Sequence, residues 1–220
     1  MWQALGGLLP IAVAVAFSSV PITVTILILL SQNRNRAALP FLVGWVIGIA
    51  AVIVVSTLLA STLPQPRRGP DPAAAVLSMV IGATLIVLGV VNLRRNSQGE
   101  STGLPGWLSR VDSFGGPVSF AVAVLLNLRP KGLLLGMAAG LALHATVRNT
   151  DELIVLIIIY TVIASSTVVI PIVASFLAPS RVEPKLIAAR GWMTRNGRLL
   201  TSLMMFIIGV VIFGYGLTQL

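Results

Sequence analysis

Two cations interrupt a long apolar stretch of this sequence. Arg129 and Lys131 flank a proline in the segment LLNLRPKGLLLG, and they are the only charged side chains between residues 113 and 147. On insertion scales an Arg or Lys at the centre of a bilayer costs about 2.5–3.5 kcal/mol, so such a side chain faces a wet cavity, a protein partner or a ligand. The pair therefore favours a binding site for an anion. Snorkelling to the nearer membrane surface is the alternative.

The acidic residues provide no counterion for this pair. Every carboxylate lies in a loop or at the end of an apolar run, away from Arg129 and Lys131. Cation exporters and proton relays place Asp, Glu or His inside the membrane, so both classes are disfavoured. The sole histidine, His144, is interpreted as an interfacial residue. The six acidic residues are Asp71, Glu100, Asp112, Asp151, Glu152 and Glu183.

No pattern of an enzyme or of a cofactor site accompanies the two cations. The chain has no cysteine, and it contains no Ser-His-Asp set, H-E-x-x-H pair or Gly-rich phosphate loop. A membrane enzyme is therefore disfavoured, and neither a cofactor nor a metal is expected. Because the sequence has no ATP-binding motif, transport would have to draw on an ion gradient or on a partner protein.

The composition predicts that membrane helices hold the two cations. Of 220 residues, 56% are hydrophobic and 10% are charged, against about 25% charged in a soluble domain. Backbone polar groups in lipid must be satisfied within the segment, so each long uncharged run is predicted to be helical. The expected fold is an all-α polytopic membrane protein, a single domain over residues 1–220. Its six predicted spans are 5–30, 38–61, 73–93, 117–146, 152–177 and 199–218.

The basic residues lie in short loops between these runs, and their distribution predicts the orientation. Ten Lys and Arg fall in loops one, three and five, and three fall in loops two and four. Cytoplasmic loops collect Lys and Arg, so we expect a plasma-membrane protein with both termini outside, and not a nucleic-acid-binding protein. Treating Arg129 to Lys131 as a loop would give seven spans and divide the cations nine against six. Six spans are therefore preferred.

Two prolines at matching places predict two broken helices. Pro21 lies near the middle of the first predicted span and Pro130 near the middle of the fourth, and a proline inside a helix removes one hydrogen bond. Three spans per half predict inverted repeats, about 1–95 and 115–220, joined by a cytoplasmic linker at 96–114. Matched interruptions in such repeats indicate a binding site near the midplane.

Hydroxyl side chains lie close to these interruptions. Ser18, Ser19 and Thr25 surround Pro21, and Thr167 lies in the middle of the fifth span. Such hydroxyls either line a polar path or bond to the backbone of broken helices, and the sequence favours neither.

Three short patterns concern packing and membrane contact. GWVIG (44–48) and GMAAG (136–140) are GxxxG patterns that permit close helix contact. The segment EPKLIAARGWMTRNGR (183–198) mixes Trp with basic and apolar residues, which predicts an interfacial helix.

Two stretches carry a family resemblance. LLSQNRNRAALPFLVGWVIG (29–48) and LLNLRPKGLLLGMAAG (125–140) resemble the signature regions of the GAP family. These are the sulfolipid-addressing (Sap) proteins of mycobacteria and other actinobacteria, within the lysine-exporter (LysE) superfamily. The resemblance implies a plasma-membrane protein with inverted three-helix repeats that moves cell-envelope glycolipids towards the outer surface.

The resemblance also implies where the broken-helix motifs lie. By position they correspond to Ser19 and Pro21, and to Asn127, Pro130 and Lys131. The superfamily usually has a compact Asn-Pro-Lys, whereas here Leu128 and Arg129 stand between the asparagine and the proline. The usual Ser-Pro is likewise separated here by Val20. The arginine among the inserted residues favours a more anionic substrate.

The leading hypothesis is a transporter that exports an anionic lipid or glycolipid of the cell envelope. Arg129 and Lys131 would bind the headgroup, Asn127, Ser18 and Ser19 would supply hydrogen bonds, and the acyl chains would remain in lipid. One alternative is an exporter of a small polar solute such as an amino acid. Another is an accessory subunit that docks on a larger lipid exporter or an envelope-synthesis enzyme. The expected partners are membrane lipids, and homo-oligomerisation is left open.

Overall fold

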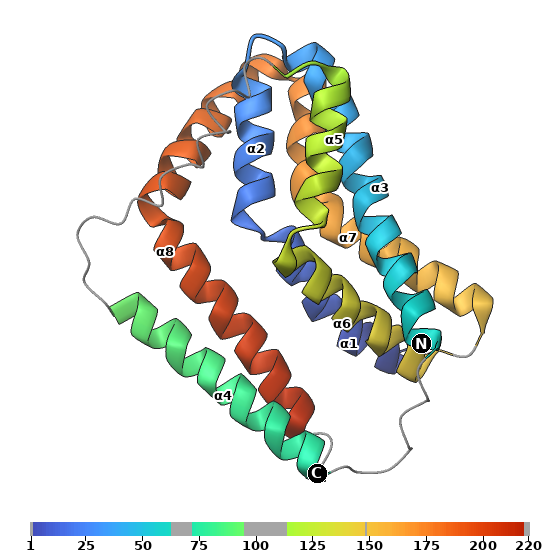
Figure 1. Ribbon diagram of the computed structural model, residues 1–220. Coiled ribbons are helices and arrows are strands. Elements are labelled where there is room, and N and C mark those ends of the chain that lie inside the picture. The colour runs from blue at the N-terminus through green and yellow to red at the C-terminus, as the bar shows by residue number, and fades with distance from the viewer. Residues whose placement is uncertain (1, 63–71, 95–113, 148, 218–220) are drawn as a thin grey trace. The chain divides into compact units, whose positions relative to one another are not determined.

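A computed structural model describes residues 2–62, 72–94, 114–147 and 149–217 (Figure 1). Every regular element in these ranges is an α-helix, which confirms the all-α prediction for this part of the chain. The predicted linker at 96–114 falls outside the described residues except for its last position. The helices are α1 (Trp2–Ala16), α2 (Ser19–Leu30), α3 (Arg34–Ser61), α4 (Pro72–Arg94), α5 (Gly116–Asn127), α6 (Pro130–Thr146), α7 (Thr150–Leu177) and α8 (Pro179–Leu217).

Several of these helices are suited to a membrane by length and composition. Helices α3 and α7 each have 28 residues and are apolar enough to cross a bilayer. The pairs α1–α2 and α5–α6 also qualify when each bent pair is taken as one span, so the described residues contain two to four candidate spans. Helix α4 covers the range predicted for the third span, and α8 covers the range predicted for the sixth span as far as Leu217. These apolar helices are consistent with a membrane-embedded protein.

The chain divides into two compact units. Unit 1 comprises Met1–Pro64 and Gly103–Trp192, and unit 2 comprises Gln65–Thr102 and Met193–Leu220. Unit 1 contains α1, α2, α3, α5, α6, α7 and the beginning of α8, and unit 2 contains α4 and the rest of α8. Each unit combines helices from both halves of the sequence, and the division into two repeats stays a prediction.

In unit 1 each unbroken helix packs against a bent pair from the other half of the sequence. Helix α3 packs against α5 and α6, helix α7 packs against α1 and α2, and α3 also contacts α7. In Figure 1 the pair α1–α2 runs in the opposite direction to α5–α6, and α3 runs in the opposite direction to α7. In the same view the two interruptions lie at about the same level (Figure 1).

Glycines allow the close approach of α3 to the pair α5–α6. A Cβ atom on Gly44 would lie 2.6 Å from the Phe120 carbonyl oxygen of α5, and one on Gly140 of α6 would lie 2.6 Å from the Ser56 carbonyl carbon of α3. No side chain fits at either distance. Both GxxxG patterns therefore serve a single helix interface, which fixes α3 against both halves of the second bent pair.

Unit 2 contains a second close helix pair. A Cβ atom on Gly209 of α8 would lie 2.8 Å from the Gly82 carbonyl oxygen of α4, and Asn92 Nδ2 donates to Ser202 Oγ at 2.9 Å. Helix α8 begins well before the predicted sixth span and includes the segment expected to be interfacial. Its backbone departs from helical geometry at Asn196, where φ is −117° and ψ is 21°.

Candidate anion-binding site

The first interruption lies between α1 and α2, which meet at an angle of 45°. Helix α1 ends at Ala16 and α2 begins at Ser19, so Pro21 is the third residue of α2 and not the break itself. Proline lacks an N–H and its ring collides with the carbonyl four residues earlier, which here belongs to Phe17. The helix therefore breaks at Phe17 and Ser18, upstream of the proline that causes it.

The second interruption lies between α5 and α6, which meet at 61°. Helix α5 ends at Asn127 and α6 begins at Pro130. Arg129 has an extended backbone, with φ −66° and ψ 152°, because a following proline disfavours the helical conformation. Pro130 occupies the first position of α6, where its missing N–H removes no helical hydrogen bond. This break therefore lies directly at its proline.

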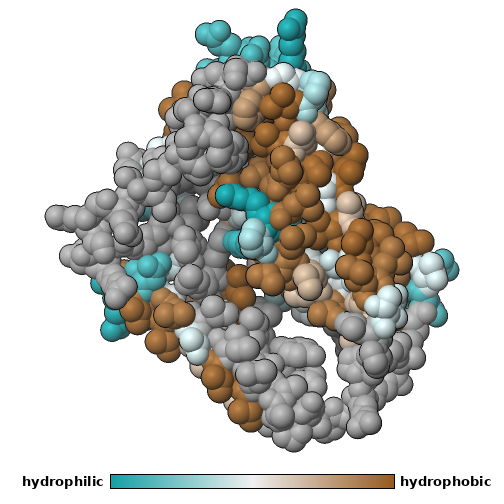
Figure 2. Space-filling model, viewed as in Figure 1, coloured by the Kyte–Doolittle hydropathy of each residue, from teal (hydrophilic) through white to brown (hydrophobic). Residues whose placement is uncertain are grey.

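The two interruptions line one cavity of about 340 Å³ within unit 1. Four lining residues come from the region of the first break, seven from the region of the second, and Trp45 comes from α3. Figure 2 shows a hydrophilic patch beside apolar surface at the level of the α5–α6 break in Figure 1. The cavity thus joins residues more than one hundred positions apart in the sequence.

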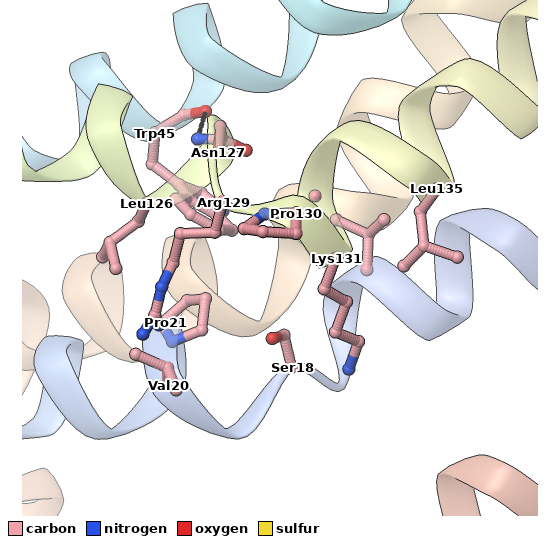
Figure 3. Close-up of a pocket in the computed structure, with 12 residues that line it drawn as sticks. Ser18, Val20, Pro21, Trp45, Leu126, Asn127, Arg129, Pro130, Lys131 and Leu135 are labelled. Atoms are coloured by element: carbon pink, nitrogen blue, oxygen red, sulfur yellow. Dashed lines mark hydrogen bonds between the residues drawn. The ribbon is translucent and has the colours of Figure 1, made fainter.

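The charges on the cavity wall are positive. Arg129 and Lys131 line it, and in Figure 3 both side chains extend from the α5–α6 break towards the side on which Ser18 and Pro21 lie. No carboxylate occurs among the described residues of the lining. The first turns of α2 and α6 also lie at the cavity, and helix N-termini carry partial positive charge. The arrangement favours an anion.

Asn127 lines the cavity but its amide nitrogen bonds to the backbone. Asn127 Nδ2 donates to the Ala123 carbonyl at 3.0 Å and to the Trp45 carbonyl of α3 at 3.5 Å. The side chain is 5% exposed. The Asn127 side chain fits because residue 48 is a glycine, since a Cβ atom at that position would lie 2.5 Å from Asn127 Nδ2. These contacts attach the end of α5 to α3, so Asn127 holds the break in position.

Of the two serines predicted to assist binding, Ser18 has a described side chain and Ser19 does not. Ser18 lines the cavity, is half-buried and makes no side-chain capping hydrogen bond to α2. Ser19 begins α2, and its side chain lies outside the described residues. Ser18 is thus the hydroxyl that the first break brings to the cavity together with the two cations.

Two threonines bond to backbone carbonyls near the first break. Thr25 Oγ1 donates to the Pro21 carbonyl at 2.8 Å, within α2. Thr167 Oγ1 reaches from α7 to the Ala16 carbonyl at the end of α1, at 2.5 Å. Hydroxyls near the breaks are expected either to line a polar path or to bond to the backbone of a broken helix. Thr25 and Thr167 bond to the backbone.

Gly132 and Trp45 also line the cavity, and neither was among the predicted site residues. A Cβ atom on Gly132 would collide with the Asn127 carbonyl oxygen, so the first turn of α6 lies directly against the end of α5. Trp45 belongs to the FLVGW motif, but nothing in a single sequence indicates which face of α3 meets the breaks. In the part of the chain that the structure describes, no group of three or more His, Asp or Glu side chains is placed to hold a metal.

Comparison with known proteins gives one match. The model of a family described as Sap, sulfolipid-1-addressing protein, matches residues 8–218. The comparisons with curated proteins and with solved structures gave no match.

Proposed function

The chain belongs to the Sap, sulfolipid-1-addressing protein family, and we propose that it exports an anionic lipid or glycolipid of the cell envelope across the plasma membrane. The family description supports a role in addressing or transporting lipid. The substrate and the transport activity are the parts that we add, from the chemistry of the cavity.

One observation carries the proposal. Two cations and two helix N-termini converge on a single cavity whose described lining contains no carboxylate. In a low-dielectric surrounding, two positive charges on one cavity wall are costly, and an anionic ligand reduces that cost. A sulfate or phosphate headgroup has the charge and the acceptor oxygens that this wall can bind.

The size of the cavity determines which part of a lipid it holds. Ligand sites range from about 300 to 1,000 Å³, and this cavity of about 340 Å³ is near the lower limit. A headgroup fits it, whereas long acyl chains do not. The acyl chains therefore stay outside, in the bilayer, while the headgroup passes between the two bent pairs.

The proposed architecture is six spans in two inverted repeats of three, with both termini outside the cytoplasm. The opposite directions of the two bent pairs in unit 1 support it, as does the packing of α3 and α7 on the bent pair of the other half. In inverted-repeat transporters a central site opens alternately to each side of the membrane. Arg129 and Lys131 would hold the headgroup during this exchange.

A transport assay tests the proposal. The purified protein in liposomes should move a headgroup-labelled sulfated glycolipid between leaflets, and the variant Arg129→Gln/Lys131→Gln should not. The matched control is Arg181→Gln/Lys185→Gln, which also removes one Arg and one Lys, from exposed positions on α8 outside the cavity lining. Both variants should keep the thermal midpoint of the native protein. Wild-type transport by the cavity variant would remove the site assignment.

The small cavity also suits a small anionic or zwitterionic solute, which keeps solute export as the second candidate. A competition experiment distinguishes lipid export from solute export. For a solute exporter, a soluble headgroup analogue should bind as tightly as the whole lipid. An accessory role beside a larger exporter predicts lipid binding but no transport in liposomes by the purified chain. Transport would return when the partner is added.

A further inference from the structure

The indole of Trp45 has a buried polar atom without a partner. The side chain is 3% exposed, and its Nε1 is covered and makes no hydrogen bond. The backbone of the same residue is bonded, since the Trp45 carbonyl accepts Asn127 Nδ2 at 3.5 Å. Trp45 lines the cavity together with Arg129 and Lys131 (Figure 3).

An unpaired donor at this depth requires an explanation. A buried N–H left without an acceptor costs about 1–3 kcal/mol, and buried tryptophans usually find a partner for theirs. Ser119 and His144 also bury a polar side-chain atom without a partner, but neither lines the cavity. Trp45 is distinguished by its place in a cavity that Arg129 and Lys131 also line.

We propose that Trp45 Nε1–H is a hydrogen-bond donor to the bound ligand, and that the ligand group is a tetrahedral oxyanion, a sulfate or phosphate ester. This inference rests on the proposed function and adds a specificity residue to it. The nitrogen is covered in the described state, so an oxygen reaches it only after the indole or the adjoining break residues shift. Binding is therefore coupled to a local movement of the Trp45 side chain or of the adjoining break residues.

The chemistry of the three donors explains why an oxyanion is favoured. Arg129 offers a planar fork, Lys131 a point charge, and Trp45 one directional N–H. A tetrahedral oxyanion presents oxygens in several directions and can accept from all three. An uncharged headgroup does not balance the two positive charges on the cavity wall, so the cavity discriminates against it.

The test combines a variant with a spectroscopic probe. Trp45→Phe removes the N–H and keeps an aromatic ring, so it should weaken binding of a sulfated glycolipid in nanodiscs by about tenfold. The control, Trp192→Phe, changes an exposed residue of α8 outside the cavity lining and should bind as the native protein does. Unchanged affinity in Trp45→Phe overturns the inference.

The probe reports the hydrogen bond itself. With Trp2, Trp107 and Trp192 changed to Phe, the single remaining indole N–H signal belongs to Trp45. It should move downfield on addition of the sulfated glycolipid and stay in place with its desulfated counterpart. Sodium sulfate alone should also move the indole signal, at a higher concentration, when the free ion enters the cavity. A signal that responds to the lipid alone means that the acyl chains are needed for binding.

The two proposals fail in different ways. A sulfated lipid that binds through Arg129 and Lys131 without moving the indole signal overturns the role of Trp45 and leaves the proposed function intact. An indole signal that moves with sulfate, in a protein that transports no lipid, overturns the proposed function and supports the oxyanion site.

Discussion

The two helix breaks are similar in how they are held and different in what they present to the cavity. At the first, Thr167 of α7 donates to the Ala16 carbonyl at the end of α1. At the second, Asn127 at the end of α5 donates to the Trp45 carbonyl of α3. Each break is therefore attached to an unbroken helix by one side chain. Only the second carries charge.

This difference separates two tasks that a broken helix can perform. Anchoring requires a side-chain donor that reaches a backbone carbonyl of the neighbouring helix, and a neutral threonine or asparagine provides it without burying a charge. Binding an anion requires positive charge at the cavity, and Arg129 and Lys131 supply it from one side only. The first break contributes Ser18 and a helix N-terminus opposite them.

The largest expected effect comes from moving charge between the breaks. Lys131→Gln should weaken binding of a sulfated glycolipid by about 10- to 100-fold, since a bond to a charged group contributes about 1.5–3 kcal/mol. Adding Ser18→Lys to that variant should restore much of the affinity, because Ser18 lines the same cavity. Binding is measured in nanodiscs.

The matched control moves a charge between two exposed positions of α8 outside the cavity lining, by Lys185→Gln with Ser180→Lys. It should not change affinity. If Ser18→Lys fails to rescue in a folded protein, the second break matters for more than its charge.

The next effect comes from closing the second break sterically. Gly132→Ala places a methyl group against the Asn127 carbonyl, so α6 must shift away from α5, at a cost of about 1–3 kcal/mol. The thermal midpoint and the lipid affinity should both fall. Gly7→Ala on α1 is the control, because a Cβ there meets nothing within 4 Å. Equal behaviour of the two variants would contradict the close contact of α6 with α5.

A smaller effect tests whether Asn127 positions the break or binds the ligand. Asn127→Ala removes the bonds to the Ala123 and Trp45 carbonyls, so the free energy of unfolding should fall by about 1 kcal/mol. Affinity should fall less than in Lys131→Gln. A large loss of affinity at unchanged stability would instead make Asn127 a direct ligand, as the sequence predicts.

The smallest effect is expected at the uncharged break. Thr167→Val removes the donor to the Ala16 carbonyl, and hydrogen bonds between membrane helices average about 0.6 kcal/mol. Stability should fall by about that amount with lipid affinity nearly unchanged. Thr146→Val, whose hydroxyl bonds within its own helix at an exposed position, is the comparison. A strong loss of binding in Thr167→Val would assign the first break a role in recognition.

The sequence predicts the helices well because hydrocarbon leaves the backbone no alternative to them. The predicted second and fifth spans, 38–61 and 152–177, lie within α3 and α7, whose bounds are Arg34–Ser61 and Thr150–Leu177. The predicted sixth span, 199–218, lies within α8 as far as Leu217. The sequence does not predict the early start of α8 at Pro179, because a basic segment with tryptophan continues a helix as readily as it ends one.

The site is predicted only in part, because its residues come together through packing. Charge in an apolar run identifies Arg129 and Lys131 without any structure. That Ser18 faces them across one cavity depends on how two bent pairs pack, and the contribution of Trp45 depends on which face of α3 meets α5. Periodicity in a helix that is apolar on all sides carries no such information.

The central claim is tested most directly by a cryo-electron microscopy structure of the protein in nanodiscs that contain a sulfated glycolipid. Headgroup density is expected between the two breaks, in contact with Arg129 and Lys131 and opposite Ser18, with the acyl chains leaving towards the bilayer. A cavity occupied only by water, with the glycolipid bound elsewhere on the protein, would contradict the account.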